Sequence, residues 1–295
     1  MRIQVVSYPI YEIGQRSNQE DSLFPPLEKA SSTGSLYILC DGMGGHAAGE
    51  VASQTVCSAM SSFILSHHAE GSIFDENDFS EALEFAYTAL NGRDTDDEKK
   101  MGTTLAFVMF HSGGCFVAHI GDSRVYHIRP SANKILFVTR DHSLVNELVE
   151  LGELSKEEAR TSRQKNVITR AMQPHQDHFV SADYTNLTDL REGDYIYMCS
   201  DGMLEQMEDR EIVNILSLRK PDQEKIRILK GATKDNKDNH SAHLIRIQSV
   251  SGVNAAAPDM EETVKKEGHR LIWYTLAAAL FLVICIALYV FMKRL

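Results

Sequence analysis

The chain has 295 residues, of which 43% are hydrophobic, so it is long and apolar enough to bury a substantial core. Its formal net charge of -11 argues against binding nucleic acid through a broad basic surface, because that mode depends on Lys and Arg. The five cysteines lack CxxC pairs and the first residues lack a secretory signal, so we expect reduced thiols and the bulk of the chain in a reducing cytoplasm.

Short runs of β-branched and aromatic residues predict strands, and helical spacing of apolar residues predicts helices. Tandem glycines at 113–114 indicate a hairpin between two of the strands. Because strands adjoin strands, with helices between groups of them, the order favours an α+β sandwich over a parallel sheet. The predicted strands are 36–40, 105–110, 115–120, 125–128, 135–138, 195–199 and 244–247, and the predicted helices are 49–65, 80–91, 143–151, 209–218 and 221–233.

The composition changes after residue 248. We expect a domain at 1–248, a polar linker at 249–270, a transmembrane helix at 271–292 and a short tail at 293–295. The uncharged segment would span roughly 33 Å as a helix, enough to cross a hydrocarbon core of about 30 Å, and a buried core helix is the alternative. These features predict a single-pass protein of the cell (inner) membrane with its main domain in the cytoplasm.

Aspartates stand where predicted strands begin or end. Asp41 and Asp201 follow apolar runs, Asp122 follows another run after one glycine, and Asp238 precedes the last strand. Each Asp-Gly pair alone is more typical of a turn. Three glycines close behind Asp41, however, exceed the needs of a turn and allow close backbone approach. We therefore expect these acids to converge on one edge of the sandwich.

Carboxylate and carbonyl oxygens are hard donors that suit Mg²⁺ or Mn²⁺ better than zinc or copper. Two such ions sharing a carboxylate and a water would turn that water into hydroxide near neutral pH, and hydroxide can attack phosphorus directly. The paired histidines at 67–68, and His240 with His243, lack zinc spacing and are expected at the surface or at an edge.

Eight short motifs occur in a characteristic order. They are 14–21 (GQRSNQED), 41–50 (DGMGGHAAGE), 102–104 (GTT), 121–126 (GDSRVY), 141–145 (DHSLV), 168–171 (ITRA), 200–203 (SDGM) and 238–239 (DN). Together they resemble the PP2C metal-dependent protein phosphatases, in particular the bacterial members, over nearly the whole predicted domain. The resemblance implies a four-layer α-β-β-α sandwich of two antiparallel sheets flanked by helices, and hydrolysis of phosphoserine and phosphothreonine in proteins.

The resemblance also implies roles for individual residues. Asp41 matches a carboxylate that bridges two Mn²⁺ or Mg²⁺ ions, Gly42 supplies a carbonyl oxygen, and Asp201 and Asp238 complete the set of ligands. Asp122, together with Asp201, matches the site of a weaker third ion.

Three further residues match the catalytic machinery of the family. Glu20 and Asp21 match acids that hold metal-bound waters, and Arg16 matches the arginine that binds the substrate phosphate. A guanidinium suits that role because its planar fork meets two phosphate oxygens at once.

Two departures from the family pattern limit what can be transferred. Met43 stands where animal relatives carry a histidine proposed to protonate the leaving group, which leaves water or His46 as donors. Ser162-Arg163 replaces the His-Pro that often precedes the position of Asn166, so peptide preference is not transferred.

Two other classes of function compete with an active phosphatase. A catalytically silent adaptor of this family would normally have lost a ligand carboxylate, and a calcium-binding module would show a D-x-D-x-D-G loop. As partners we expect phosphoproteins near the membrane, such as a serine/threonine kinase or its substrates, and no nucleic acid.

Overall fold

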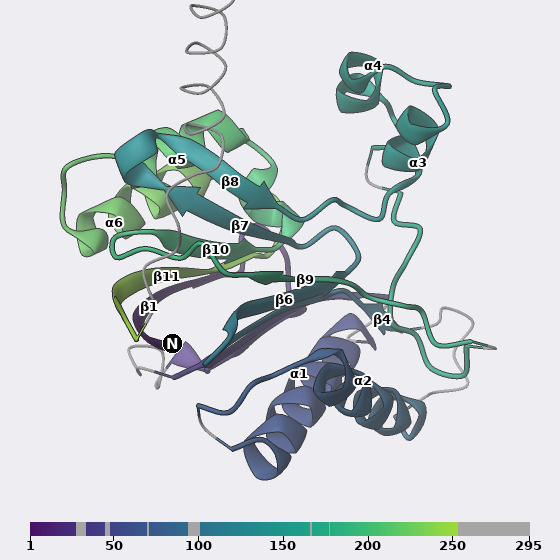
Figure 1. Cartoon of the computed structure of the whole chain (residues 1–295). Helices are drawn as coiled ribbons and strands as arrows, with labels where there is room; N and C mark the ends of the chain where they lie inside the picture. Colours follow the sequence, from purple (N-terminus) through teal and green to yellow (C-terminus); the bar gives the residue numbers. More distant parts are fainter. Residues whose placement is uncertain are drawn as a thin grey trace, which may run out of the picture. The chain divides into compact units, whose positions relative to one another are not determined.

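Two antiparallel sheets stack face to face, and helices cover their outer faces (Figure 1). The structure, a computed structural model, describes residues 1–27, 34–44, 48–69, 71–93, 101–165, 167–176 and 178–252. These residues belong to one compact unit, Met1–Gly252. The expected sandwich of two antiparallel sheets flanked by helices is therefore confirmed.

The first sheet has five strands and carries helices α5 (Asp209–Leu216) and α6 (Asp222–Thr233) on its outer face (Figure 1). The two longest strands of this sheet pair along their whole length at one side of it. The strand order is β1 (Arg2–Glu12), β11 (His240–Ser251), β10 (Tyr195–Cys199), β7 (Arg124–Arg129) and β8 (Lys134–Val138).

The second sheet carries helices α1 (Ala48–His67) and α2 (Glu76–Asn91) on its outer face (Figure 1). Helix α2 begins at a capping box, in which the Asp75 side chain accepts from the third residue of the helix and the Asp78 side chain accepts in return. The strand order is β2 (Asp21–Phe24), β3 (Leu36–Met43), β5 (Leu105–His111), β6 (Gly114–Ile120) and β9 (Asp183–Leu187), and β4 (Gly102–Thr103) pairs with β3.

Strand β3 shows how the four layers are held together. Leu36, Ile38 and Cys40 pack in the core against α1 and α2, whereas Tyr37 and Leu39 pack in the core between the sheets. Successive side chains of a strand point to opposite faces, so an apolar run without alternation is buried on both sides. A third apolar core lies between the first sheet and the helices α5 and α6.

Helices α3 (Leu144–Glu150) and α4 (Lys156–Thr161) stand away from both sheets (Figure 1). We refer to α3 and α4 together as the flap. Asp141 lies at the base of the flap, and its carboxylate accepts two hydrogen bonds of 2.6 Å from Arg124. Asn146 in α3 donates to the Asp141 carbonyl at 2.9 Å. The flap is therefore tied to β7 at its root.

The expected localisation in a membrane needs correction. Among the described residues, no helix is both long and apolar enough to cross a bilayer. Helix α1 has 20 residues, but it carries polar and charged side chains such as Glu50 and Gln54. The segment 271–292, on which the expected transmembrane helix and inner-membrane location depended, lies outside the described residues, as does the linker from 253 onward.

Two expectations about single residue types can be compared with the structure. Cys40, Cys57, Cys115 and Cys199 are buried free thiols, as expected. The expectation that His240 and His243 lie at the surface or an edge is wrong, because both are buried. His243 lies between the sheets, where it shares a hydrogen bond of 3.1 Å with the Ser7 hydroxyl and its ring packs against Tyr37.

Candidate metal centre

Asp41 lies near the end of β3, where its backbone is held on both sides. Across the sheet it pairs directly with Asp21, the first residue of β2. On the other side, the Thr104 N–H donates to the Asp41 carbonyl at 2.8 Å and the Thr104 hydroxyl accepts from the Asp41 N–H at 3.0 Å. Two acidic side chains are thereby placed at the same edge by rigid strands.

Gly42 occupies a position where no larger residue fits. Its N–H donates to the Glu20 carbonyl at 3.0 Å. A Cβ atom built on Gly42 would lie 2.1 Å from the Gly49 carbonyl oxygen and 2.7 Å from that of Glu20. The start of α1 can therefore approach β3 closely only because residue 42 is glycine.

The first sheet contributes Asp201 and Asp238 to the same edge. Asp201 opens a short 3₁₀ helix, η3 (Asp201–Leu204), directly after β10, and Asp238 stands two residues before β11. The two loops interlock, since Asn236 donates to the Gly202 carbonyl at 2.6 Å. A Cβ on Gly202 would lie 2.0 Å from the Asn239 carbonyl oxygen, so this contact also requires glycine.

The electrostatics of the site show that the acids share one region. Burial and the neighbouring carboxyl groups raise the pKa of Asp41 well above its ordinary value, and burial and Asp238 raise the pKa of Asp201. Burial is also the main cause that raises the pKa of Asp21 to about 7, with Asp201 and Asp238 adding to it. The charged forms of these groups are therefore disfavoured unless a cation lies among them.

Asp122 extends this cluster from the turn between β6 and β7. Burial and the nearby Asp201 raise the pKa of Asp122 to about 7. Within the described residues, Oδ1 of Asp122 and Oδ1 of Asp21 are buried atoms without a hydrogen-bond partner. Buried oxygens of this kind require a donor or a cation, and carboxylates with a carbonyl oxygen are the donor set that Mg²⁺ and Mn²⁺ prefer. The residues fit a divalent cation.

Arg16 and Glu20 line the outer side of this cluster. Arg16 donates a hydrogen bond of 2.7 Å to Oδ2 of Asp238, and this contact is the main cause that raises the pKa of the guanidinium. The Glu20 N–H donates to Oδ1 of Asn239 at 2.8 Å. Just over half of the Arg16 side chain is exposed, at 53%, so its remaining N–H groups are open to a ligand.

The acidic side chains of the site lie near one another, but among the described residues no three of them have donor atoms within 4.8 Å of one another. Among the described residues, the only three potential ligands with donor atoms within 4.8 Å of one another are His119, His142 and Asp183. That group is already occupied by protein contacts, because Arg170 bonds to Asp183 at 3.0 Å and His119 bonds to the Arg140 carbonyl at 2.8 Å. We assign no metal to it.

Three residues that support the site were not given roles from the sequence. The Asn239 amide bonds at once to Glu20 and to the carbonyls of Ile13 and Asn18, and the Ser200 hydroxyl donates to Asp21 at 3.0 Å. Thr104 holds Asp41. Ser200 and Asn239 stand next to Asp201 and Asp238 in sequence, and Thr104 belongs to the GTT motif, which is the signal that could have identified them. His46, considered above as a proton donor, and Asn166, the position preceded by Ser162-Arg163, lie outside the described residues.

Comparison with known proteins agrees with this geometry. The profile described as protein phosphatase 2C matches residues 12–237, which end one residue before Asp238. The serine/threonine protein phosphatase PstP of Mycobacterium tuberculosis is 33% identical over 203 residues, 69% of this chain and 37% of PstP. The protein phosphatase PhpP of Streptococcus pneumoniae is 33% identical over 208 residues, 70% of this chain and 82% of PhpP. The match thus spans little more than a third of PstP but most of PhpP.

Solved structures share the fold. The crystal structure of Mycobacterium tuberculosis PstP/Ppp aligns with a TM-score of 0.71 and 29% identity, covering 83% of this chain and 99% of that one. A crystal structure of the PstP catalytic domain in complex with two manganese ions aligns with a TM-score of 0.69 and 28% identity, covering 84% of this chain and all of that one.

The stacked sheets with acids at one shared edge form a sandwich domain whose oxygen donors suit divalent cations. The chain belongs to the protein phosphatase 2C family of serine/threonine protein phosphatases. The expected family is therefore confirmed.

Proposed function

We propose that this protein hydrolyses phosphoserine and phosphothreonine in proteins with the help of bound Mn²⁺ or Mg²⁺. The observation that carries the proposal is the cluster of Asp41, Asp201 and Asp238 at one edge of both sheets, where burial and neighbouring carboxyl groups raise the pKa of Asp41 and of Asp201. The family and the manganese-containing PstP structure support the same conclusion.

We assign the cation ligands as the carboxylates of Asp41, Asp201 and Asp238 and the carbonyl of Gly42, with Asp122 and Asp201 for a weaker third ion. Asp41 would be the shared ligand, as its match to the family motif implies. When bound, a pair of divalent cations activates a water for attack on phosphorus and neutralises the charge on the phosphate oxygens.

The chain's own residues bind and orient the substrate. Arg16 would bind two phosphate oxygens through the N–H groups that Asp238 leaves free. Glu20 and Asp21 would hold waters of the site as hydrogen-bond acceptors, and Asn239 and Ser200 fix their positions. Met43 has no proton to donate, so the leaving alcohol takes its proton from water or from another group.

The proposed substrates are phosphoproteins, including serine/threonine kinases or the proteins they phosphorylate. The relatives PstP and PhpP are named as protein phosphatases, which supports this class of substrate. The flap formed by α3 and α4 is followed by Ser162-Arg163, where the chain differs from the family. The preference for residues around the phosphorylated site is therefore not inferred from the relatives.

The test is hydrolysis of an aryl phosphate and of phosphoserine, phosphothreonine and phosphotyrosine peptides by the full chain. We expect turnover with Mn²⁺ that disappears with EDTA and falls at least about 100-fold in Asp201→Asn. Asp235→Asn, which changes an aspartate with 75% of its side chain exposed, should retain the activity. Turnover that persists in EDTA would contradict the proposal.

A further inference from the structure

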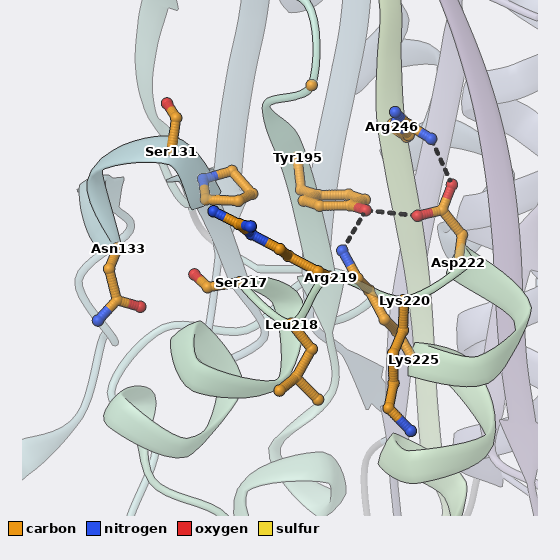
Figure 2. A pocket seen from close by; sticks show the side chains of 12 residues that line it. Ser131, Asn133, Tyr195, Ser217, Leu218, Arg219, Lys220, Asp222, Lys225 and Arg246 are labelled. Carbon is orange, nitrogen blue, oxygen red and sulfur yellow. Dashed lines mark hydrogen bonds and ion pairs between the residues drawn. The ribbon is translucent and has the colours of Figure 1, made fainter.

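A pocket lies on the helix side of the first sheet (Figure 2), and none of the acids of the candidate metal centre lines it. It has a volume of about 560 Å³, within the range of small-molecule sites. The pocket is built from the β7–β8 turn, the start of β10, and the loop that joins α5 to α6. Tyr195 lines it at one end of β10, whereas Asp201 follows the other end, roughly 20 Å away at about 3.3 Å per residue.

The side chains that line this pocket carry mainly positive charge. Four of them are cationic and one is anionic, although the whole chain has a formal net charge of -11. The cations are Arg219, Lys220, Lys225 and Arg246, and the anion is Asp222. Such a local excess of positive charge concentrates anions.

The floor of the pocket is a chain of hydrogen bonds that includes Asp222, the one carboxylate among the lining residues (Figure 2). The Tyr195 hydroxyl donates to Oδ1 of Asp222, and Arg246 donates to Oδ2 at 3.2 Å. Lys225 donates to the Tyr195 hydroxyl at 2.9 Å and to the Leu216 carbonyl at 2.7 Å. Asp222 is thus shared by Tyr195 and Arg246. Lys220 pairs with Glu224 at 3.1 Å, and Arg219 is a lining cation without a carboxylate partner among the described residues.

Three lining side chains have donor groups that are not used within the described part of the chain. Arg219 has no hydrogen-bond or ion-pair partner in the part of the chain that the structure describes, and Figure 2 shows it extending across the pocket. Arg246 uses one of its five N–H groups on Asp222. The Ser217 hydroxyl is a buried atom that lacks a partner among the described residues, and buried hydroxyls normally have one.

We propose that this pocket binds a small molecule carrying phosphate groups, with Arg219, Arg246 and Ser217 as its main contacts. Planar guanidinium groups bind phosphate through two parallel hydrogen bonds, and a hydroxyl can serve a third oxygen. Arg219 and the N–H groups that Arg246 does not use on Asp222 match a ligand with more than one negative charge. The volume exceeds that of a single phosphate ion, so a diphosphate or a nucleoside diphosphate fits the space better.

The test is calorimetric titration of the full chain with inorganic phosphate, pyrophosphate and ADP, in EDTA so that no divalent cation draws phosphate to the carboxylate cluster. We expect saturable binding that is tightest for the diphosphates. Arg219→Glu should weaken it at least tenfold, whereas Arg93→Glu, a charge reversal at an exposed arginine after α2, should change it less than twofold. Arg16→Ala should bind like the wild type, because Arg16 lies at the other site.

The three probes also distinguish recognition of the phosphate groups from recognition of the nucleoside. Similar affinities for pyrophosphate and ADP would show that the phosphate groups are recognised, and a tenfold advantage of ADP would show additional contacts to the nucleoside. Arg246→Gln, checked for an intact melting transition, should weaken binding as Arg219→Glu does. Absence of saturable binding, binding of ADP without pyrophosphate, or equal affinities of Arg219→Glu and Arg93→Glu would overturn the proposal.

Discussion

Arg16 and Asp238 are joined by a hydrogen bond of 2.7 Å, so the cation proposed to bind phosphate is held by a carboxylate proposed to bind metal. The pair lies between the loop before β2 and the loop before β11, and Asn239 connects the same two loops. Substrate binding and metal binding are therefore expected to be coupled through one side chain.

Replacing Arg16 should weaken substrate binding. A hydrogen bond to a charged group contributes about 1.5–3 kcal/mol, so Arg16→Ala should lower kcat/KM about 10- to 100-fold, mainly through KM. Arg16→Lys should recover only part of the loss, because an ammonium group does not form the two parallel bonds. Steady-state kinetics with a phosphothreonine peptide measure both, with Arg93→Ala as the control. An unchanged KM in Arg16→Ala would contradict the proposed contact between Arg16 and the substrate phosphate.

Adding one methyl group at Gly42 should disrupt the metal centre. Its Cβ would lie 2.1 Å from the Gly49 carbonyl oxygen, so β3 and α1 must move apart and shift Asp41. We expect Mn²⁺-dependent turnover to fall at least about 100-fold, since displacements near 1 Å can have that effect. Gly231→Ala in α6 is the matched control, because its Cβ meets no atom within 4 Å. Equal activities of the two variants would show that the close approach is unimportant.

Asn239 should contribute to stability and not only to activity. Its buried amide bonds to Glu20, Ile13 and Asn18, and removing it leaves those backbone groups unsatisfied. Asn239→Ala should lower the free energy of unfolding by about 2–4 kcal/mol. Urea denaturation without metal measures this, with the exposed Asn77→Ala as a control. A loss no larger than that of Asn77→Ala would contradict the bracing role.

His243 should make the stability depend on pH. Burial lowers the pKa of His243 to about 3, from an ordinary value of 6.5. Between these values the unfolded chain binds a proton that the folded protein does not, so the contribution of His243 falls as the pH drops below 6.5. At pH 5 the loss is roughly 2 kcal/mol relative to pH 7, since one pKa unit corresponds to about 1.4 kcal/mol.

The variant His243→Asn isolates this effect from other titrating groups. The difference in unfolding free energy between the wild type and His243→Asn should shrink as the pH falls from 7 to 5. Urea denaturation at several pH values measures that difference. A difference that stays constant over this range would mean that His243 does not remain neutral in the folded protein.

The strands that could be predicted from the sequence lie mostly inside the sheets. Strands β3, β5, β6 and β10 are continuous apolar runs because they are buried on both faces. The strands that were not predicted include β1, β2 and β9, each of which lies at an edge of its sheet. Edge strands are partly exposed and mixed in composition, and β1 contains Pro9, so their pairing depends on neighbours distant in sequence.

The candidate site shows the same division. The acids at strand ends could be identified because each stands at a visible change from apolar to polar residues, as Asp41 and Asp201 do. Asp21 pairs directly with Asp41, and the Glu20 N–H donates to the Asn239 side chain; both contacts join residues whose proximity depends on how the strands are aligned. Register is a property of the assembled sheet, so these contacts could not be predicted from spacing alone.

The acids of the candidate centre come from both halves of the sandwich, with Asp21 and Asp41 on one sheet and Asp201 and Asp238 beside the other. A cation bound by Asp41 and Asp201 together would act as a cross-link between two layers whose shared core is otherwise mainly apolar. Affinity for the cation would then report on the alignment of the layers. Substitutions in the core between the sheets, for example at Tyr37 or Ile245, would therefore weaken cation binding although neither side chain is a proposed ligand.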